Sequence, residues 1–214
     1  MAKYPIFLEL GDRRVVLIGG GAVATRKARV LLDAGARLVV VTDQANEVLI
    51  DLCTTHGAQF IRAKYAKEYL GEATLVVAAT SDDKVNRQVY ADCQTLGILC
   101  NVVDDPPHCD FFVPAVVKRG DLQIAIGTEG NCPAYAGHLR KKLEGLFTDQ
   151  HGQFLAELEC MRHRIINTVP DLATRKTLLG GLVDDDSFAR FSTEGADAWR
   201  AQAEEAIDSC IAGS

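Results

Sequence analysis

Along its first hundred residues the chain alternates short apolar runs with segments whose apolar residues recur at helical spacing. The runs are rich in β-branched residues, which is typical of strands buried in a parallel sheet. We expect strands at 15–18, 38–41, 60–61, 75–80 and 98–103. We expect a helix at 22–34, a second at about 48–57, a brief connecting helix that ends at 69–71, and a fourth from a cap at 81–83 to 97. This alternation predicts an α/β fold on a doubly wound parallel sheet.

The pattern changes after Asp104-Asp105-Pro106-Pro107. Two apolar strands, 111–117 and 122–126, flank a short polar turn and predict a hairpin. A basic helix then starts near Pro133, and from about Asp149 the apolar spacing is helical throughout. We therefore expect three parts: a sheet domain at 1–110, a hairpin and helix at 111–148, and a helical domain at 149–214.

The turn after the first predicted strand carries the motif G-x-G-x-x-A. A strand that passes directly into a helix leaves free backbone N–H groups and a positive dipole end, which together bind phosphate. Gly19 permits the tight turn, Gly21 lets a pyrophosphate approach the backbone, and Ala24 allows close helix packing. Ala22 and Val23 complete the predicted cofactor loop. Alone, the motif also fits an ordinary glycine-rich turn, and its context decides between the two.

That context is an acidic residue at the tip of the second predicted strand. Asp43 follows the glycines by about twenty positions, where a carboxylate accepts hydrogen bonds from a ribose diol and repels a 2′-phosphate. We therefore expect NAD as the cofactor. Asp43 also fits as the N-cap of the following helix, and the two roles can coexist. Thr80 and Asn101, which end or line strands, are predicted to contact the cofactor.

Composition narrows the class of protein. The 214 residues are 48% hydrophobic and carry a formal net charge of −6, which argues against a nucleic-acid partner. Seven cysteines, an odd number without a C-x-x-C pair, indicate a reducing compartment. We see neither a signal-peptide pattern nor an apolar run of membrane-spanning length, and so expect a cytoplasmic protein without a membrane partner.

An ordered set of short motifs resembles one family. The set resembles the precorrin-2 dehydrogenase module of siroheme synthases, closely over 4–146 and loosely in the helical tail. The motifs are Pro5-Ile6-Phe7, Gly19-Gly20-Gly21-x-Val23-Ala24-x-x-Lys27, Ala78-Ala79-Thr80-x-Asp82, Asn86, Asn101-Val102-Val103-Asp104, Phe112-x-x-Pro114-Ala115 and Gly130-x-x-Pro133. The chain departs from the family at 128–132, where relatives often carry a turn rich in Ser, Gly and Thr.

The resemblance implies a fold and an activity. It implies a homodimer with a Rossmann-like nucleotide domain, a dimerisation hairpin and a helical tail. It implies that NAD oxidises precorrin-2 to sirohydrochlorin, and some members also insert a divalent metal such as ferrous iron. By this resemblance Asp104 is the acid–base residue. Asp104 follows a buried strand at the edge where open α/β sheets bind ligands, although it also fits as a turn residue.

Basic side chains are needed around a polycarboxylated substrate. Candidates from the hairpin turn and the following helix are Lys118, Arg119, Arg140, Lys141 and Lys142, although each also fits an ordinary solvated surface. His108 and Cys109 could touch an incoming metal, but such a pair more often serves turn and packing, and we predict no resident metal site. Two rival functions stay open: an NAD-sensing regulatory module without turnover, and a dehydrogenase for an unrelated substrate.

Overall fold

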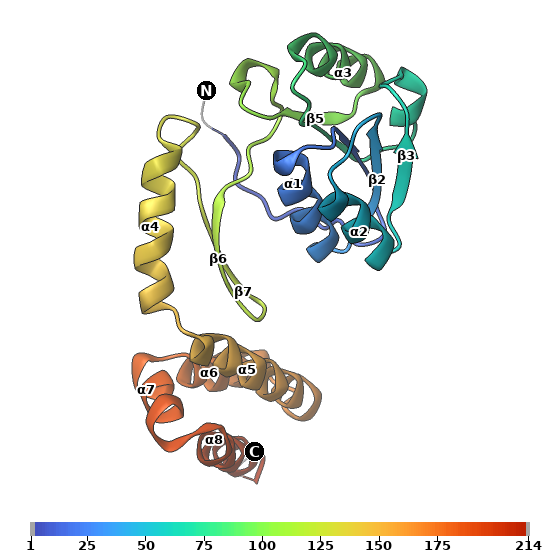
Figure 1. The fold of residues 1–214 in the computed structure, drawn as a ribbon. Coiled ribbons are helices and arrows are strands. Elements are labelled where there is room, and N and C mark those ends of the chain that lie inside the picture. Colours follow the sequence, from blue (N-terminus) through green and yellow to red (C-terminus); the bar gives the residue numbers. More distant parts are fainter. Residues whose placement is uncertain (1–2, 213–214) are drawn as a thin grey trace. The chain divides into compact units, whose positions relative to one another are not determined.

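The computed structural model describes residues 3–212 and divides the chain into two compact units (Figure 1). The first unit comprises residues 1–113 and the second comprises residues 114–214. The predicted separation of the second unit into a hairpin part and a helical domain stays a prediction.

The first unit is built on a five-stranded parallel sheet in the order β3-β2-β1-β4-β5. In the central pairs Ile18 lies opposite Val41 on one side and Ala78 on the other. The strand order reverses between β1 and β4, and in open α/β sheets ligands bind at the carboxyl edge beside such a reversal. The strands are β1 (Arg14–Ile18), β2 (Arg37–Thr42), β3 (Gln59–Arg62), β4 (Leu75–Ala78) and β5 (Leu99–Val102).

Helices cover both faces of this sheet. Val15 and Leu17 share a core with α1 and α2, whereas Val16 and Ile18 share another with α3. Alternate residues of one strand therefore serve opposite faces, which confirms the predicted doubly wound, Rossmann-like fold. The helices are α1 (Ala22–Asp33), α2 (Glu47–Thr55), α3 (Asp83–Leu96) and the short 3-10 helices η1 (Lys67–Leu70) and η2 (Pro106–His108).

The second unit begins with an antiparallel hairpin of β6 (Ala115–Arg119) and β7 (Leu122–Ile126). Gly120 occupies the first position of its two-residue turn with φ 56, a conformation that glycine adopts without a steric cost. The predicted strand starts later than expected, after Pro114, because proline has no N–H to donate to a ladder. Helix α4 (Pro133–Leu146) begins at Pro133, as predicted.

Four further helices complete the second unit, as the apolar spacing predicts. They bury a core around Phe154, Ile165 and Trp199, and the indole Nε1 of Trp199 donates to the buried Ser187 Oγ at 2.8 Å. The helices are α5 (Asp149–Thr168), α6 (Leu172–Leu182), α7 (Asp185–Glu194) and α8 (Ala196–Ala212). Among the helices of residues 3–212, none combines the length and apolarity needed to cross a membrane.

Candidate cofactor and active site

Two of the three glycines after β1 are required by the fold itself. A Cβ atom on Gly19 would lie 2.4 Å from the Ala79 carbonyl oxygen, and Gly19 has φ 128. A Cβ atom on Gly20 would lie 1.9 Å from the Gln44 carbonyl oxygen. The chain thus packs the loop after β1 tightly against the ends of β4 and β2.

Gly21 differs, because no atom lies within 4 Å of the position its Cβ would take. Gly21 is the N-cap of α1, whose first turn has neither a side-chain cap nor an acidic residue. The first N–H groups of α1, at Ala22, Val23 and Ala24, have no partner within the helix, and the positive end of the helix dipole lies at the same place. This arrangement fits the pyrophosphate of a dinucleotide.

Thr25 and Asn46 hold the loop in place. The Thr25 hydroxyl donates to the Gly21 carbonyl at 3.0 Å, and the Asn46 side-chain amide donates to the Thr25 hydroxyl at 3.0 Å. The Asn46 backbone N–H donates to the Gly20 carbonyl at 3.0 Å. These two positioning residues were not among the sequence-predicted site residues, because the contacts join segments about twenty residues apart.

Asp43 lies directly after β2 and is exposed. The interpretation of Asp43 as a helix cap is wrong, because Asn46 is the N-cap of α2 and accepts from the Leu49 N–H at 2.8 Å. Within residues 3–212 the Asp43 carboxylate has no hydrogen bond or ion pair, and so it is available to a ribose diol. Its contact with the cofactor stays a prediction.

Thr80 lies beside the glycine loop, since Ala79 contacts Gly19. Its hydroxyl donates to Asn86 Oδ1 at 2.7 Å, and Asn86 Nδ2 donates back to the Thr80 carbonyl at 3.1 Å. Asn86 is buried on α3, on the same stripe as Val89 and Cys93, and fixes the turn after β4. A polar residue on a buried helical stripe is the signal that points to such a role.

Asn101 is buried on β5, where its side-chain amide donates to the Phe111 carbonyl at 2.9 Å. This bond holds the returning segment 109–111 against the strand. The amide is thus used inside the protein, and the predicted cofactor contact of Asn101 stays a prediction.

Asp104 is exposed in the turn that follows β5. It has φ 61, a left-handed conformation that aspartate tolerates better than most residues. The turn is closed by the Asp105 N–H, which donates to the Val102 carbonyl at 3.3 Å. The Asp104 carboxylate has no hydrogen bond or ion pair within the described chain, and it stands at the same edge of the sheet as the glycine loop.

His108 and Cys109 are bonded to their own neighbours. His108 Nδ1 lies 2.8 Å from Asp105 Oδ2, and the His108 ring packs edge-on against Tyr90. The Cys109 thiol donates to the Val102 carbonyl at 3.1 Å, and burial raises the pKa of this thiol. Residues 3–212 contain no group of three or more metal-ligating side chains. Contact of these two residues with an incoming metal stays a prediction.

The predicted substrate-binding cations lie in the second unit. The Arg119 guanidinium donates to the Phe147 carbonyl at 2.8 Å and to the Glu144 carbonyl at 3.1 Å, so it caps the end of α4. Arg140 forms an ion pair with Glu144. Lys118, Lys141 and Lys142 are exposed and have no ion pair within the described residues. Substrate binding by these residues stays a prediction.

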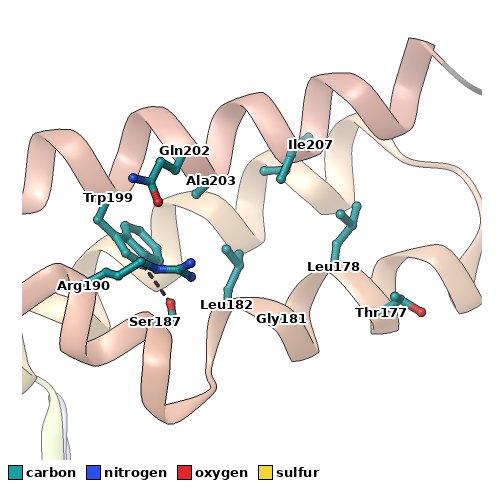
Figure 2. Close-up of a pocket in the computed structure, with 11 residues that line it drawn as sticks. Thr177, Leu178, Gly181, Leu182, Ser187, Arg190, Trp199, Gln202, Ala203 and Ile207 are labelled. Carbon is teal, nitrogen blue, oxygen red and sulfur yellow. Dashed lines mark hydrogen bonds between the residues drawn. The ribbon is translucent and has the colours of Figure 1, made fainter.

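A cavity of about 280 Å³ lies among α6, α7 and α8 (Figure 2). Leu178, Leu182 and Ile207 line it, and Trp199 and Arg190 stand at one end. None of the residues predicted for the cofactor, the proton transfer or the substrate lies in its wall. We therefore place the candidate site at the carboxyl edge of the sheet instead.

Comparison with known proteins identifies the family of this unit. The sequence model of a family described as "Putative NAD(P)-binding" matches residues 6–115, more than half of the chain. The chain belongs to this NAD(P)-binding family. A second model, described as "Sirohaem biosynthesis protein central", matches residues 119–146. The predicted resemblance to siroheme synthases and the predicted nicotinamide cofactor are thereby confirmed.

Curated relatives of this chain include siroheme synthases. This family member is 35% identical over 209 residues to the siroheme synthase of Psychrobacter sp., covering 96% of this chain and 43% of the relative. It is 37% identical over 195 residues to siroheme synthase 1 of Aeromonas salmonicida, covering 91% of this chain and 42% of the relative. The chain therefore spans less than half the length of these curated relatives.

Among solved structures, one described as "SirC, precorrin-2 dehydrogenase" matches with a TM-score of 0.80. The two chains are 24% identical, and the match covers 97% of this chain and 100% of the other. At this identity the match shows that the fold is shared.

Proposed function

We propose that the protein oxidises precorrin-2 to sirohydrochlorin with NAD. The observation that carries this proposal is the placement of two unpartnered features at one sheet edge. One is the open N-terminus of α1 at Gly21, and the other is the Asp104 carboxylate. The names of the siroheme synthase relatives and of the precorrin-2 dehydrogenase with the same fold supply the substrate.

The chain's own residues divide the work of such a reaction. Bound NAD would accept a hydride, which carries two electrons and one proton from the substrate, and a second proton must leave to a base. The α1 N–H groups from Ala22 onward hold the pyrophosphate, and Asp43 accepts hydrogen bonds from the ribose hydroxyls. Asp104 accepts the second proton, since an exposed carboxylate with no internal partner is free to act as a base.

The test is anaerobic conversion of precorrin-2 with NAD, followed by absorbance. The wild-type chain should form sirohydrochlorin and NADH in equal amounts. Asp104→Asn should bind NAD as the wild type does and lose about two to four powers of ten in rate, the usual contribution of a positioned base. No conversion by the wild type would overturn the activity. A wild-type rate in Asp104→Asn would remove Asp104 from the mechanism.

The same preparation separates the rival functions. An NAD-sensing module would bind NAD and form no NADH from precorrin-2.

Metal insertion, which the resemblance implies for some relatives, is tested by adding ferrous or cobalt ion to sirohydrochlorin. If His108 and Cys109 touch the metal, the double variant His108→Ala, Cys109→Ala should lose insertion and keep oxidation.

We further propose that the protein forms a homodimer through its hairpin and the adjoining helices. Two observations support this assembly. Within the described residues β6 and β7 form a sheet of only two strands, which leaves both outer edges without a neighbouring strand, and Val116 is 37% exposed on it. Apolar edges of this kind are normally paired or covered. Sedimentation at micromolar concentration should give a dimer, and a monomer would contradict the proposal.

A further inference from the structure

Lys27 occupies an unusual place on α1. Ala24, Ala28 and Leu31 form the stripe by which this helix packs on the sheet, and Lys27 lies on the same stripe and is half-buried. Val103 and Phe111, which flank the turn that carries Asp104, pack against the same core. The long Lys27 side chain therefore extends from the buried side of α1, on the face of the sheet to which this turn belongs.

The partial burial of Lys27 affects the charge of its ammonium group. Burial is the largest cause that lowers its pKa, and neighbouring Arg26 lowers it further, whereas Asp104 and Cys109 oppose the shift. The charges of Asp105 and Asp110 also raise the pKa of the Cys109 thiol. Within residues 3–212 Lys27 forms no ion pair or hydrogen bond. A half-buried cation in this state binds an incoming anion strongly, because much of the desolvation has already occurred.

The other candidate cations differ in this respect. Arg119 donates hydrogen bonds to carbonyl groups at the end of α4, and Arg140 forms an ion pair with Glu144. Lys27 combines three properties: partial burial, no ion pair in the described chain, and an electrostatic interaction with the proposed base, Asp104. This combination marks it as a ligand-binding residue rather than part of a solvated surface.

We propose that Lys27 binds a carboxylate of the tetrapyrrole substrate and so holds the macrocycle against Asp104. The inference rests on the proposed function, which supplies a substrate with carboxylate side chains. The ammonium donates to the carboxylate as a charge-assisted hydrogen bond. No bond is made or broken at Lys27, which makes it a substrate-binding residue.

The test compares three variants. Lys27→Gln removes the charge, Lys27→Arg keeps it, and Arg26→Gln removes the adjacent exposed charge as a matched control. We measure the KM for precorrin-2, the kcat, the Kd for sirohydrochlorin and the Kd for NAD. A thermal unfolding midpoint for each variant shows whether the fold is retained.

Lys27→Gln should raise both the KM for precorrin-2 and the Kd for sirohydrochlorin at least about tenfold, the usual loss for a charge-assisted hydrogen bond. Its NAD affinity should stay at the wild-type value. Lys27→Arg should recover most of the loss, and Arg26→Gln should stay within about twofold of the wild type. Unchanged tetrapyrrole binding in Lys27→Gln would overturn the proposal, and so would an equal loss of NAD affinity, which would place Lys27 on the pyrophosphate.

The sirohydrochlorin measurement keeps this inference separate from the proposed function. If the wild type binds sirohydrochlorin but does not oxidise precorrin-2, the activity fails while the role of Lys27 is still decided by the binding comparison. If the wild type binds no tetrapyrrole, both proposals fall.

Discussion

Gly19 faces the carbonyl group of Ala79 so closely that a Cβ atom on Gly19 would lie 2.4 Å from the oxygen. This contact joins the end of β1 to the end of β4, where the strand order of the sheet reverses. Two residues further on, Gly21 has no atom within 4 Å of its Cβ position. Glycines of one short motif therefore serve different purposes, one for packing and one for a ligand.

This difference predicts opposite outcomes for two alanine substitutions. Gly21→Ala should keep a free energy of unfolding within about 1 kcal/mol of the wild type, the usual range for a change at an N-cap. It should weaken NAD binding at least about tenfold, because the methyl group would stand where the pyrophosphate approaches. Gly19→Ala should unfold at a clearly lower temperature, since backbone atoms must move. Thermal unfolding and NAD titration check both, and wild-type NAD affinity in Gly21→Ala would contradict the assignment.

Asp43 predicts the choice between the two nicotinamide cofactors. Its carboxylate has no hydrogen bond or ion pair within residues 3–212, so it is available to accept from a ribose diol and to repel a 2′-phosphate. The wild type should bind NAD more tightly than NADP. Asp43→Ala should reduce the difference between the NAD and NADP affinities. The reason is that NAD binding weakens by about 1 kcal/mol or more for each lost hydrogen bond. Dissociation constants for both cofactors give the answer, and tighter binding of NADP by the wild type would reject the prediction.

Asp104 allows stability and activity to be separated. Its φ of 61 is easy for glycine, tolerable for asparagine and unfavourable for alanine. Asp104→Gly and Asp104→Asn should therefore be about as stable as the wild type, and Asp104→Ala should be less stable by about 1 kcal/mol. All three should lose oxidation. A variant that is active in spite of the lost carboxylate would show that the residue serves only the turn.

The parallel sheet could be predicted from the sequence because β-branched runs and helical spacing are local signals. The glycine loop was equally visible, since its motif joins a strand to a helix over a few residues. The role of Asn46 was missed, because three polar residues precede α2 and only the geometry shows which of them caps it. The stripe position of Lys27 could be seen in the helical pattern, but its neighbours Asp104 and Cys109 lie far along the chain.

The helical part of the second unit offers a pH-dependent prediction. Arg200 donates to Glu157 at 2.6 and 2.8 Å and lies next to Trp199, the single tryptophan of the chain. The hydrogen bonds from Arg200 lower the pKa of Glu157 in the folded state. The unfolded chain has the ordinary pKa near 4.5, so the stabilisation is fully present above that pH. It is lost as the pH falls through the lower, folded value.

Glu157→Gln should therefore lower the stability of this unit at neutral pH and flatten its loss of stability below about pH 4.5. Asp197→Asn is the matched control, because Asp197 also pairs with Arg200 at 3.2 Å but its side chain is 98% exposed. An exposed ion pair contributes little to the free energy of unfolding, so this variant should have the stability and pH dependence of the wild type. Denaturant unfolding followed by Trp199 emission at several pH values measures both. Asp171, whose pKa is also lowered by its hydrogen bonds to Thr174, titrates in every variant, and its effect cancels in the differences. An identical pH dependence in Glu157→Gln and the wild type would show that the pair adds nothing to the acid stability of the helical core.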